Sequence, residues 1–537
     1  MSDDHNIPTA KANLKIEPGE RLARPFTRFA KLSSSGGIVL LLMTAVAMIW
    51  ANSDYADSYN EIFNETETRI TVAHNPHHGP AAEHDAPDAE HDIGADHADE
   101  AQHAPDVQSI IDEANKAVDG EGYGDKDYEK ADKHAWSPLP EAPRWWQGHS
   151  TVDWINDLLM AIFFLVVGLE IKREILVGEL ASPKRAALPI FGAIGGMLGP
   201  ALIFAGFNMG KSTIGGWGIP MATDIAFAVG ILAMLGSRIP RSLMVFLTSL
   251  AIVDDLGALI VIAVFYTDQI QMAYLGYAGI TIGILVFMNI LRVRWITLYL
   301  VLGLPLWYFV YMSGVHATIA GVLLAMTIPA HARVNAVNFV FSTRKALDIF
   351  EKAEDDPDTD VTQSSERRAA VNAIMKNSRQ VLPPLHRIEY VLHPWVAFFI
   401  IPVFALANAG IPIHGGVMEN LGNTSSLGII FGLFLGKPLG IGIMCFIAVK
   451  LGIASLPPGI TWRHIIGAAT LGGIGFTMAI FIANLAFANS PTDLEHAKLA
   501  ILVASAISAI VGAGILLTCK SKPEPEPETL GPLVDDD

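Results

Sequence analysis

Residues 249–268 read "SLAIVDDLGALIVIAVFYTD", an apolar segment long enough to cross a membrane that carries two adjacent aspartates, Asp254 and Asp255. One acidic residue at the centre of a membrane helix costs about 3 kcal/mol on insertion scales. Two adjacent carboxylates also repel each other when both are ionised. Because this cost is unusual at a purely structural position, the segment indicates a functional site at membrane depth.

The rest of the chain is similarly apolar. Of its 537 residues, 51% are hydrophobic and 17% are charged, and the mean hydropathy is +0.39. The formal net charge of −18 is concentrated in a polar segment between Asp54 and Glu141 and in the C-terminal tail. The two cysteines, Cys445 and Cys519, lie in apolar segments and form no disulfide framework. This composition excludes a soluble globular enzyme and gives no indication of a nucleic-acid partner.

Apolar runs predict an all-α polytopic membrane protein with about twelve transmembrane helices. The predicted helices begin near Gly37, Val152, Arg185, Gly218, Leu243, Ala273, Trp295, Gly314, Val391, Leu427, His464 and Ala497. The first run follows a polar segment and lacks a small-residue cleavage site, so we expect a retained helix and no cleaved signal peptide.

Lysine and arginine residues determine the predicted orientation. They recur in the N-terminal segment and in alternate loops, whereas the opposite short loops contain almost none, so both termini are predicted to be cytoplasmic. The predicted segments are a cytoplasmic N-terminal segment (1–36), helix one (37–52), a periplasmic loop (53–150), helices two to eight (151–330), a cytoplasmic insert (331–388), helices nine to twelve (389–519) and a cytoplasmic acidic tail (520–537).

The periplasmic loop is rich in histidine and acidic residues. Such residues are metal ligands, but His84, His91, His97 and His103 lack the compact spacing of a metal site. The composition favours a solvated, disordered acidic loop. The cytoplasmic insert has the composition of a flexible linker with some helix.

Two predicted helices contain residues that interrupt a helix. In the fourth, Gly218 and Pro220 precede Asp224, and in the eleventh a glycine cluster at 472–475 precedes Thr477. Non-helical backbone at membrane depth is tolerated only where it lines a cavity or is buried in protein. Matching interruptions in two halves of a chain indicate a transporter site between inverted repeats. The alternative is a pair of closely packed helices rich in small residues.

Charged residues on neighbouring helices complete the predicted site. Adjacent helix positions point about 100° apart, so one of Asp254 and Asp255 can face a neighbouring helix while the other faces a cavity. Asp224 could add a third carboxylate, or Thr223 and Asp224 could cap a half-helix. Lys437 is either the counter-ion of a carboxylate or a lysine that snorkels to the interface.

Carboxylate, hydroxyl and carbonyl oxygens bind a hard cation, and the same carboxylates bind protons. A site that holds the cation or protons, but not both, exchanges one for the other. We therefore interpret the membrane aspartates as a site of competitive cation and proton binding.

Six motifs in order resemble the NhaA-type bacterial sodium/proton antiporters. They are "PMATDIAFAVGIL", "AIVDDLGALIVIA", "SGVHATIAGV", "VLHPWVAFFIIPVFALANAG", "GKPLGI" and "GGIGFTMAIFIA". The resemblance covers essentially all predicted helices. It implies a fold in which interrupted helices four and eleven cross, a location in the bacterial inner membrane, and alternating access. It also implies pH-regulated, electrogenic exchange of Na⁺ or Li⁺ for a larger number of protons, with no cofactor.

The resemblance also implies roles for residues of the site. Asp254 and Asp255 become the pair that binds protons and the transported Na⁺ or Li⁺. Thr223 and Asp224 lie at the crossing of the broken helices and shape the site. Lys437 becomes the salt-bridge partner and a proton carrier.

Further residues match positions that the family uses for pH regulation: Glu170, Arg173, Glu174, Glu389 and His316. The alternative for the first four is interfacial anchoring, and for His316 it is a structural role at a helix start.

This sequence departs from the family pattern at its two inserts. The long acidic loop stands where the family usually has a short hairpin that helps dimerisation, which puts a homodimer through that hairpin in question. The longer cytoplasmic insert leaves the position of Glu389 relative to the other pH-regulation residues open.

Two other function classes also place carboxylates or a cation path inside the membrane. An intramembrane aspartyl protease would use Asp224 and Asp254 as a pair sharing a proton, but gives no role to Asp255 or Lys437. A cation channel would conduct passively, whereas an exchanger couples the cation to proton flux.

Overall fold

The computed structural model of the chain describes residues 35–63, 150–267, 270–332, 334–353, 364–412 and 421–519. All of these residues belong to one compact unit, and every regular element among them is a helix, which confirms the predicted all-α class. Nearly all of the N-terminal segment, most of the acidic loop with His84, His91, His97 and His103, and the acidic tail lie outside the described residues. Among those described, no three His, Cys, Asp or Glu side chains form a group that could hold a metal ion.

Eight of the described helices are long and apolar enough to cross a membrane. Four are single α-helices: α7 (Pro183–Asn208), α9 (Arg241–Phe265), α10 (Met272–Ile290) and α22 (Pro491–Leu517). Four combine several elements: α5 (Thr151–Trp154), η1 (Ile155–Leu159) and α6 (Met160–Leu176); η3 (Ser212–Met221) and α8 (Ile225–Met234); α15 (Pro384–Trp395), η5 (Val396–Ile400) and α16 (Ile401–Asn408); α18 (Thr424–Phe431), η6 (Gly432–Gly436) and α19 (Lys437–Lys450).

Further apolar helices bring the number of candidate membrane spans closer to the predicted twelve. Two bent pairs are α2 (Ser35–Ala51) with α3 (Ala56–Phe63), bent by 115°, and α20 (Trp462–Leu471) with α21 (Phe476–Ala486), bent by 49°. Two shorter apolar helices are α11 (Ile296–Met312) and α12 (Thr318–Thr327). If each bent pair is one span, the structure has ten candidate spans, so a count of twelve stays a prediction.

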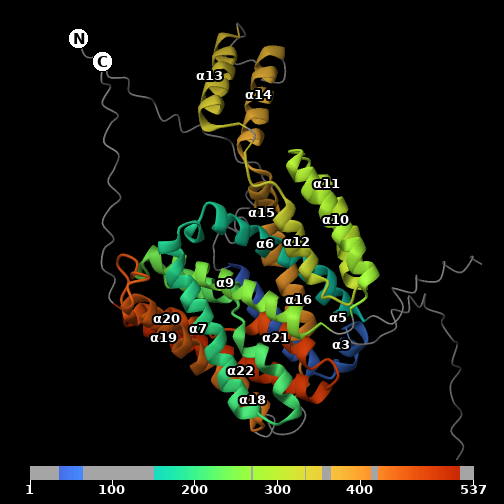
Figure 1. Cartoon of the computed structure of the whole chain (residues 1–537), viewed down its shortest axis with the longest axis vertical. Coiled ribbons are helices and arrows are strands. Elements are labelled where there is room, and N and C mark those ends of the chain that lie inside the picture. Colours follow the sequence, from blue (N-terminus) through green and yellow to red (C-terminus); the bar gives the residue numbers. More distant parts are fainter. Residues whose placement is uncertain are drawn as a thin grey trace, which may run out of the picture. The chain divides into compact units, whose positions relative to one another are not determined.

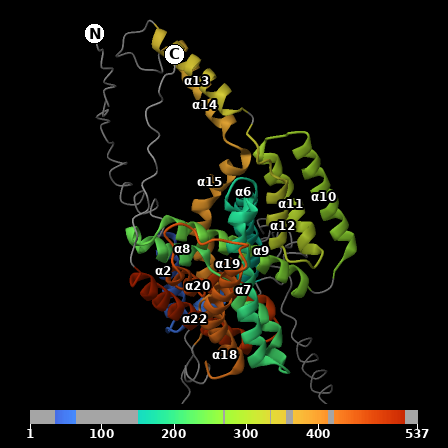
Figure 2. The same ribbon diagram turned by 60° about the vertical axis from the view of Figure 1, so that its left-hand side comes forward.

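The predicted cytoplasmic insert contains more helix than its composition indicated. Helices α13 (Ala336–Lys352) and α14 (Ser365–Val381) pack against each other, and both views show them side by side (Figures 1 and 2). Helix α15 then begins at Pro384, before the expected start near Val391. Proline is favoured in the first helical turn because the missing N–H would have no helical partner there.

Both predicted helix interruptions are present. Residues Ala222 to Asp224 are extended between the 3₁₀-helix η3 and α8, and the glycine cluster separates α20 from α21. The two breaks contact each other, because the Asp224 backbone N–H donates to Ile474 O at 2.7 Å. Buried backbone groups freed by one break are thus partly satisfied by the other.

The helices fall into two bundles by their packing. The first bundle comprises η3, α7–α9 and α18–α22, and the second comprises α2, α6, α10–α12, α15 and α16. In both views α10, α11 and α12 stand together, apart from α19, α20 and α22 (Figures 1 and 2). The second bundle has its own hydrophobic cluster, which includes Leu165, Leu306 and Ile388.

Glycines permit the closest approach within the first bundle. Gly195 and Gly199 of α7 face Gly436 and Gly440 at the junction of η6 and α19. A Cβ atom on Gly195 would collide with Gly440 O, and one on Gly440 would collide with Gly195 O. Small residues four apart on both helices let the backbones touch, which favours van der Waals packing in a membrane. This packing fixes Lys437, which lies between the two glycines of its helix.

Candidate functional site

Asp254 and Lys437 form a buried ion pair. Lys437 Nζ donates to Asp254 Oδ2 at 2.5 Å and to Thr223 Oγ1 at 2.8 Å. The side chains of Asp254 and Lys437 are both 0% exposed. Lys437 therefore does not snorkel to the interface, and it is the counter-ion that the sequence offered as one of two alternatives.

Local helix geometry places Lys437 at this depth. It is the first residue of α19 and follows the π-turn η6, and Pro438 comes next. A π-turn widens the helix by one residue and is frequent at functional sites. Proline so early in the helix has no N–H to lose from the ladder. The lysine can therefore point toward α9 without breaking the span.

Asp255 faces a cavity and not a partner side chain. The cavity has a volume of about 360 Å³ and is also lined by Asp224, Glu170 and Thr477. Neither carboxylate oxygen of Asp255 has a hydrogen-bond partner, although the residue is only 1% exposed. The two adjacent aspartates therefore point in different directions, as their helix positions predicted: Asp254 contacts Lys437 on a neighbouring helix, and Asp255 lines the cavity.

Asp224 caps both half-helices that begin at the two breaks. Its Oδ1 accepts from Phe227 N at 3.0 Å, and its Oδ2 accepts from Thr477 N at 3.1 Å and from Thr477 Oγ1 at 2.5 Å. Thr223 donates from Oγ1 to Gly472 O at 2.9 Å. One carboxylate therefore satisfies the N-terminal N–H groups of α8 and α21, where the helix dipoles favour negative charge.

The charges of the site do not cancel. Asp224, Asp254 and Asp255 contribute three negative charges when all are ionised, and Lys437 contributes one positive charge. The N-termini of α8 and α21 add a positive charge of about 0.5 each, which leaves about −1. Taking an uncompensated charge out of water is costly, so this arrangement favours binding of a monovalent cation or of protons.

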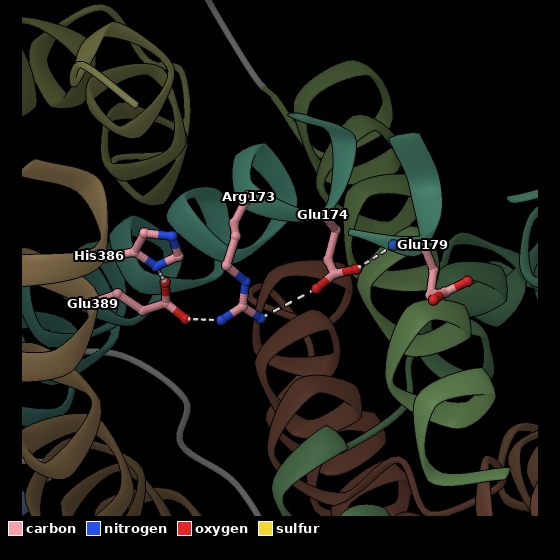
Figure 3. Close-up of polar contacts among 5 residues, drawn as sticks. All are labelled: Arg173, Glu174, Glu179, His386 and Glu389. Atoms are coloured by element: carbon pink, nitrogen blue, oxygen red, sulfur yellow. Dashed lines mark hydrogen bonds and ion pairs between the residues drawn. The ribbon is translucent and has the colours of Figure 1, made fainter. Parts of the chain in front are cut away.

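A second charged cluster connects α6 with α15 (Figure 3). Arg173 donates from Nη1 to Glu389 Oε1 at 2.5 Å and from Nη2 to Glu174 Oε1 at 3.3 Å. His386 Nδ1 lies 3.7 Å from Glu389 Oε2, and Glu179 N donates to Glu174 Oε2 at 3.1 Å. Despite the long insert, Glu389 lies beside Arg173 because α15 starts early and carries it back to α6.

Glu170 links this cluster to the cavity of Asp255. It lies one helical turn before Arg173 on α6 and lines the cavity, whereas the ion pairs of Figure 3 do not include it. His393 of α15 lines the same cavity and was not identified from the sequence. Its helical spacing of one turn from Glu389 is the signal that could have revealed it.

His316 lies apart from the other residues predicted for pH regulation. Its Nε2 is 2.5 Å from the backbone oxygen of Tyr266, the residue that ends α9. The structure therefore places it at one end of the helix that carries Asp254 and Asp255, away from Arg173 and Glu389.

Three asparagines form a chain of side-chain hydrogen bonds that sequence reasoning missed. Asn408 Nδ2 donates to Asn156 Oδ1 at 2.9 Å, and Asn484 Nδ2 donates to Asn408 Oδ1 at 2.7 Å. Asn408 and Asn484 each stand alone in an apolar run, and Asn156 lies beside Asp157, which is a weak signal because single amides in membrane helices are common.

Comparison with known proteins identifies relatives over almost the whole chain. The family model described as Na+/H+ antiporter 1 matches residues 27–83 and 126–516. A protein of Oleidesulfovibrio alaskensis named "Na(+)/H(+) antiporter NhaA" is 42% identical over 522 residues, which cover 97% of this chain and 99% of that relative. A protein of Koribacter versatilis with the same name is 38% identical over 502 residues, which cover 94% of this chain and 93% of that relative. Another of the same name, from Wolinella succinogenes, is 47% identical over 380 residues, which cover 71% of this chain and 83% of that relative.

Proposed function

Because this chain belongs to the Na⁺/H⁺ antiporter 1 family and is a multi-pass membrane antiporter for Na⁺ and H⁺, we propose that Asp254 and Asp255 are the residues that the two ions occupy in turn. Asp224, Thr223 and Lys437 complete this site. The family assignment agrees with the exchanger interpretation and replaces the protease and channel alternatives.

One observation supports this proposal most strongly: Asp255 has two buried carboxylate oxygens without a hydrogen-bond partner, at the wall of a cavity. The second oxygen of Asp254 also lacks a partner. Buried polar atoms are nearly always satisfied in native structures. Na⁺ and Li⁺ are hard cations that prefer oxygen ligands, and protons compete for the same oxygens.

The charges of the site support electrogenic exchange. When protons neutralise both Asp254 and Asp255 on one side and a single Na⁺ or Li⁺ replaces them on the other, one net charge crosses the membrane in each cycle. Lys437 can serve as a further proton carrier because its partner Asp254 changes charge during that cycle. The inward proton-motive force would then drive sodium out of the cell.

Location and sidedness follow from the distribution of basic residues. We propose that the protein lies in the bacterial inner membrane with both termini in the cytoplasm. The cavity of Asp255 lies near the start of α2, the end of α6 and the start of η5, so it belongs to the cytoplasmic half. Alternating access then requires a second state in which the site opens to the periplasm.

The cluster of Arg173, Glu174 and Glu389, together with Glu170, is proposed to regulate exchange by pH. Its ion pairs join α6 to α15 close to the cavity, so a change in protonation there alters how the two helices pack. His316 is a separate candidate for pH response at the other end of α9.

The test is exchange in everted vesicles, measured by the dequenching of a pH dye after addition of Na⁺ or Li⁺ across a pH series. Asp254→Asn and Asp255→Asn are expected to abolish dequenching while the protein still inserts. Asp348→Asn makes the same chemical change on exposed α13 and should leave exchange intact. Normal exchange by both site variants would reject the assignment, and a passive current without proton coupling would indicate a channel.

A further inference from the structure

We propose that Asn156, Asn408 and Asn484, with a layer of phenylalanines beneath them, form the periplasmic gate of this antiporter. The inference rests on the alternating access proposed above. Its evidence is the arrangement of three helices, α6 with η1, α16 and α21, on the side of the ion site opposite to the cavity.

The outer layer of the gate is the chain of asparagine amides. It ties η1 and α16 of the second bundle to α21 of the first bundle. Asn408 is 1% exposed, and its Nδ2 also donates to Phe404 O at 3.0 Å. Both Nδ2 and Oδ1 of Asn408 are therefore hydrogen-bonded. The bond between Asn484 and Asn408 is the hydrogen bond of this layer that joins the two bundles.

The inner layer consists of three fully buried phenyl rings. Phe481 of α21 packs against Phe164 of α6 with ring centroids 5.9 Å apart, and against Phe404 of α16 at 6.4 Å. These are the same three helices that supply the asparagines. Tilted aromatic pairs at such distances are favourable contacts, and they exclude water from the path between the layers.

Each of the three helices shows the same order of residues from the site outward. On α21, Thr477 bonds Asp224, Phe481 follows one turn later, and Asn484 comes next. On the span of α16, Ile401 lines the cavity before Phe404 and Asn408.

The α6 span, which runs in the opposite direction, carries Val167 at the cavity, then Phe164, then Asn156. A cavity-lining residue, a phenylalanine and an asparagine therefore follow one another in the same order on all three helices, with a longer interval between Phe164 and Asn156 across η1. The ion site is reached from the cavity and is closed at the other end by two layers.

The chemistry of an amide suits a gate that must open. In the closed state the three amides bond one another, and in an open state water can replace these bonds at little cost. Apolar side chains would lose their contacts on opening with no such replacement. Because only the closed state contains the bond between Asn484 and Asn408, its removal favours opening toward the periplasm.

The experiment measures access to the site from outside. Met478 lines the cavity and is replaced by cysteine in a background with Cys445→Ser and Cys519→Ser. A membrane-impermeant methanethiosulfonate reagent is added to right-side-out or to everted vesicles. In the background protein, labelling should be faster in everted vesicles, because the cavity opens to the cytoplasmic side.

The double variant Asn408→Ala, Asn484→Ala is expected to raise the labelling rate in right-side-out vesicles about fivefold, which equals about 1 kcal/mol at 1.4 kcal/mol per factor of ten. Asn208→Ala is the matched control. Asn208 is also fully buried and also donates to a carbonyl one turn earlier, but its second bond, to Thr424 O, stays within the first bundle. The gate proposal would be overturned if the labelling rate in right-side-out vesicles were unchanged in the double variant. An equal increase of that rate in the control would also overturn it.

A second measurement applies if the alanine variant fails to insert. The pair Asn408→Cys, Asn484→Cys is introduced into the protein with Cys445→Ser and Cys519→Ser and without the cysteine at Met478. Oxidation then forms a disulfide between the two new cysteines, and this cross-link is expected to stop exchange until a reductant is added. Exchange that continues in fully cross-linked protein would contradict the proposal. Labelling reports on access without requiring exchange, so the gate can fail while the roles of Asp254 and Asp255 stand. Those roles can likewise fail in the dye assay while the labelling result stands.

Discussion

Replacing Lys437 by methionine isolates the charge of the buried pair. Methionine has a similar length and leaves little cavity, so packing changes are small. Lys437 Nζ lies 2.5 Å from Asp254 Oδ2, and neither side chain reaches solvent. Removing one partner of a buried ion pair costs about 3–5 kcal/mol, because the other charge is left uncompensated. The variant also removes the hydrogen bond to Thr223 Oγ1, worth about 1 kcal/mol.

The double variant Lys437→Met, Asp254→Asn supplies the comparison. Replacing both members of a buried pair by neutral groups is often close to neutral. We expect each single variant to lose about 3–5 kcal/mol in the free energy of unfolding, and the double variant to lose about 1 kcal/mol through the bond to Thr223. Two single losses of about 3–5 kcal/mol against about 1 kcal/mol for the double variant correspond to a coupling of about 5 kcal/mol or more between the two sites.

The assay is denaturant titration of the purified protein in mixed micelles, followed by tryptophan fluorescence. Lys498→Met is the control, because this half-buried lysine of α22 forms no ion pair within the described residues, and its loss should cost less than about 1 kcal/mol. A single Lys437 variant as stable as the control, or a double variant whose loss equals the sum of the singles, would refute the reasoning.

Three further substitutions test other parts of the structure. Thr477→Val removes the hydroxyl that donates to Asp224 Oδ2 and keeps the backbone N–H that donates to the same oxygen, so it should cost about 1–3 kcal/mol of stability in the same titration. Gly195→Val places methyl groups against the backbone at Gly440 and should cost at least about 1–3 kcal/mol, with wild-type stability contradicting the close approach of α7 and α19. Arg173→Gln breaks an ion pair in which the Arg173 side chain is 31% exposed and the Glu389 side chain is 11% exposed, so the free energy of unfolding should fall by about 1–3 kcal/mol while the pH profile of exchange in vesicles is displaced; an unmoved profile would favour interfacial anchoring.

Local sequence signals were sufficient for the all-α membrane class and for the two helix interruptions, whereas the count of twelve spans stays a prediction. Helix length in a bilayer is set by an apolar run, and a proline or a glycine cluster in the interior of a helix weakens its hydrogen-bond ladder. The break before Asp224 and the break at 472–475 were therefore predictable. The high cost of burying charge also singled out Asp254, Asp255 and Lys437.

Features that depend on packing between distant segments could not be predicted. The π-turns η1 and η6 arise where a helix adjusts to its neighbours, and no residue type specifies them. The asparagine chain requires three helices to meet, and the sequence gives only isolated amides. The alternatives for Lys437 were likewise decided only by the depth at which α19 packs against α7.

The predicted cytoplasmic insert contains more structure than its composition indicates. Its polar residues suggested a flexible linker with some helix, and α13 and α14 pair along buried positions such as Ala346 and Ala370. The same insert brings Glu389 back to Arg173, which its length alone had left open.

The most direct measurement of the central claim is the pH of a weakly buffered solution of purified protein when NaCl is added at alkaline pH, with choline chloride as the reference. If a sodium ion and protons share the carboxylates of Asp254 and Asp255, sodium should release protons in proportion to the amount of protein. The double variant Asp254→Asn, Asp255→Asn should release none. Sodium that binds with no release of protons, or equal release from the double variant, would contradict the account.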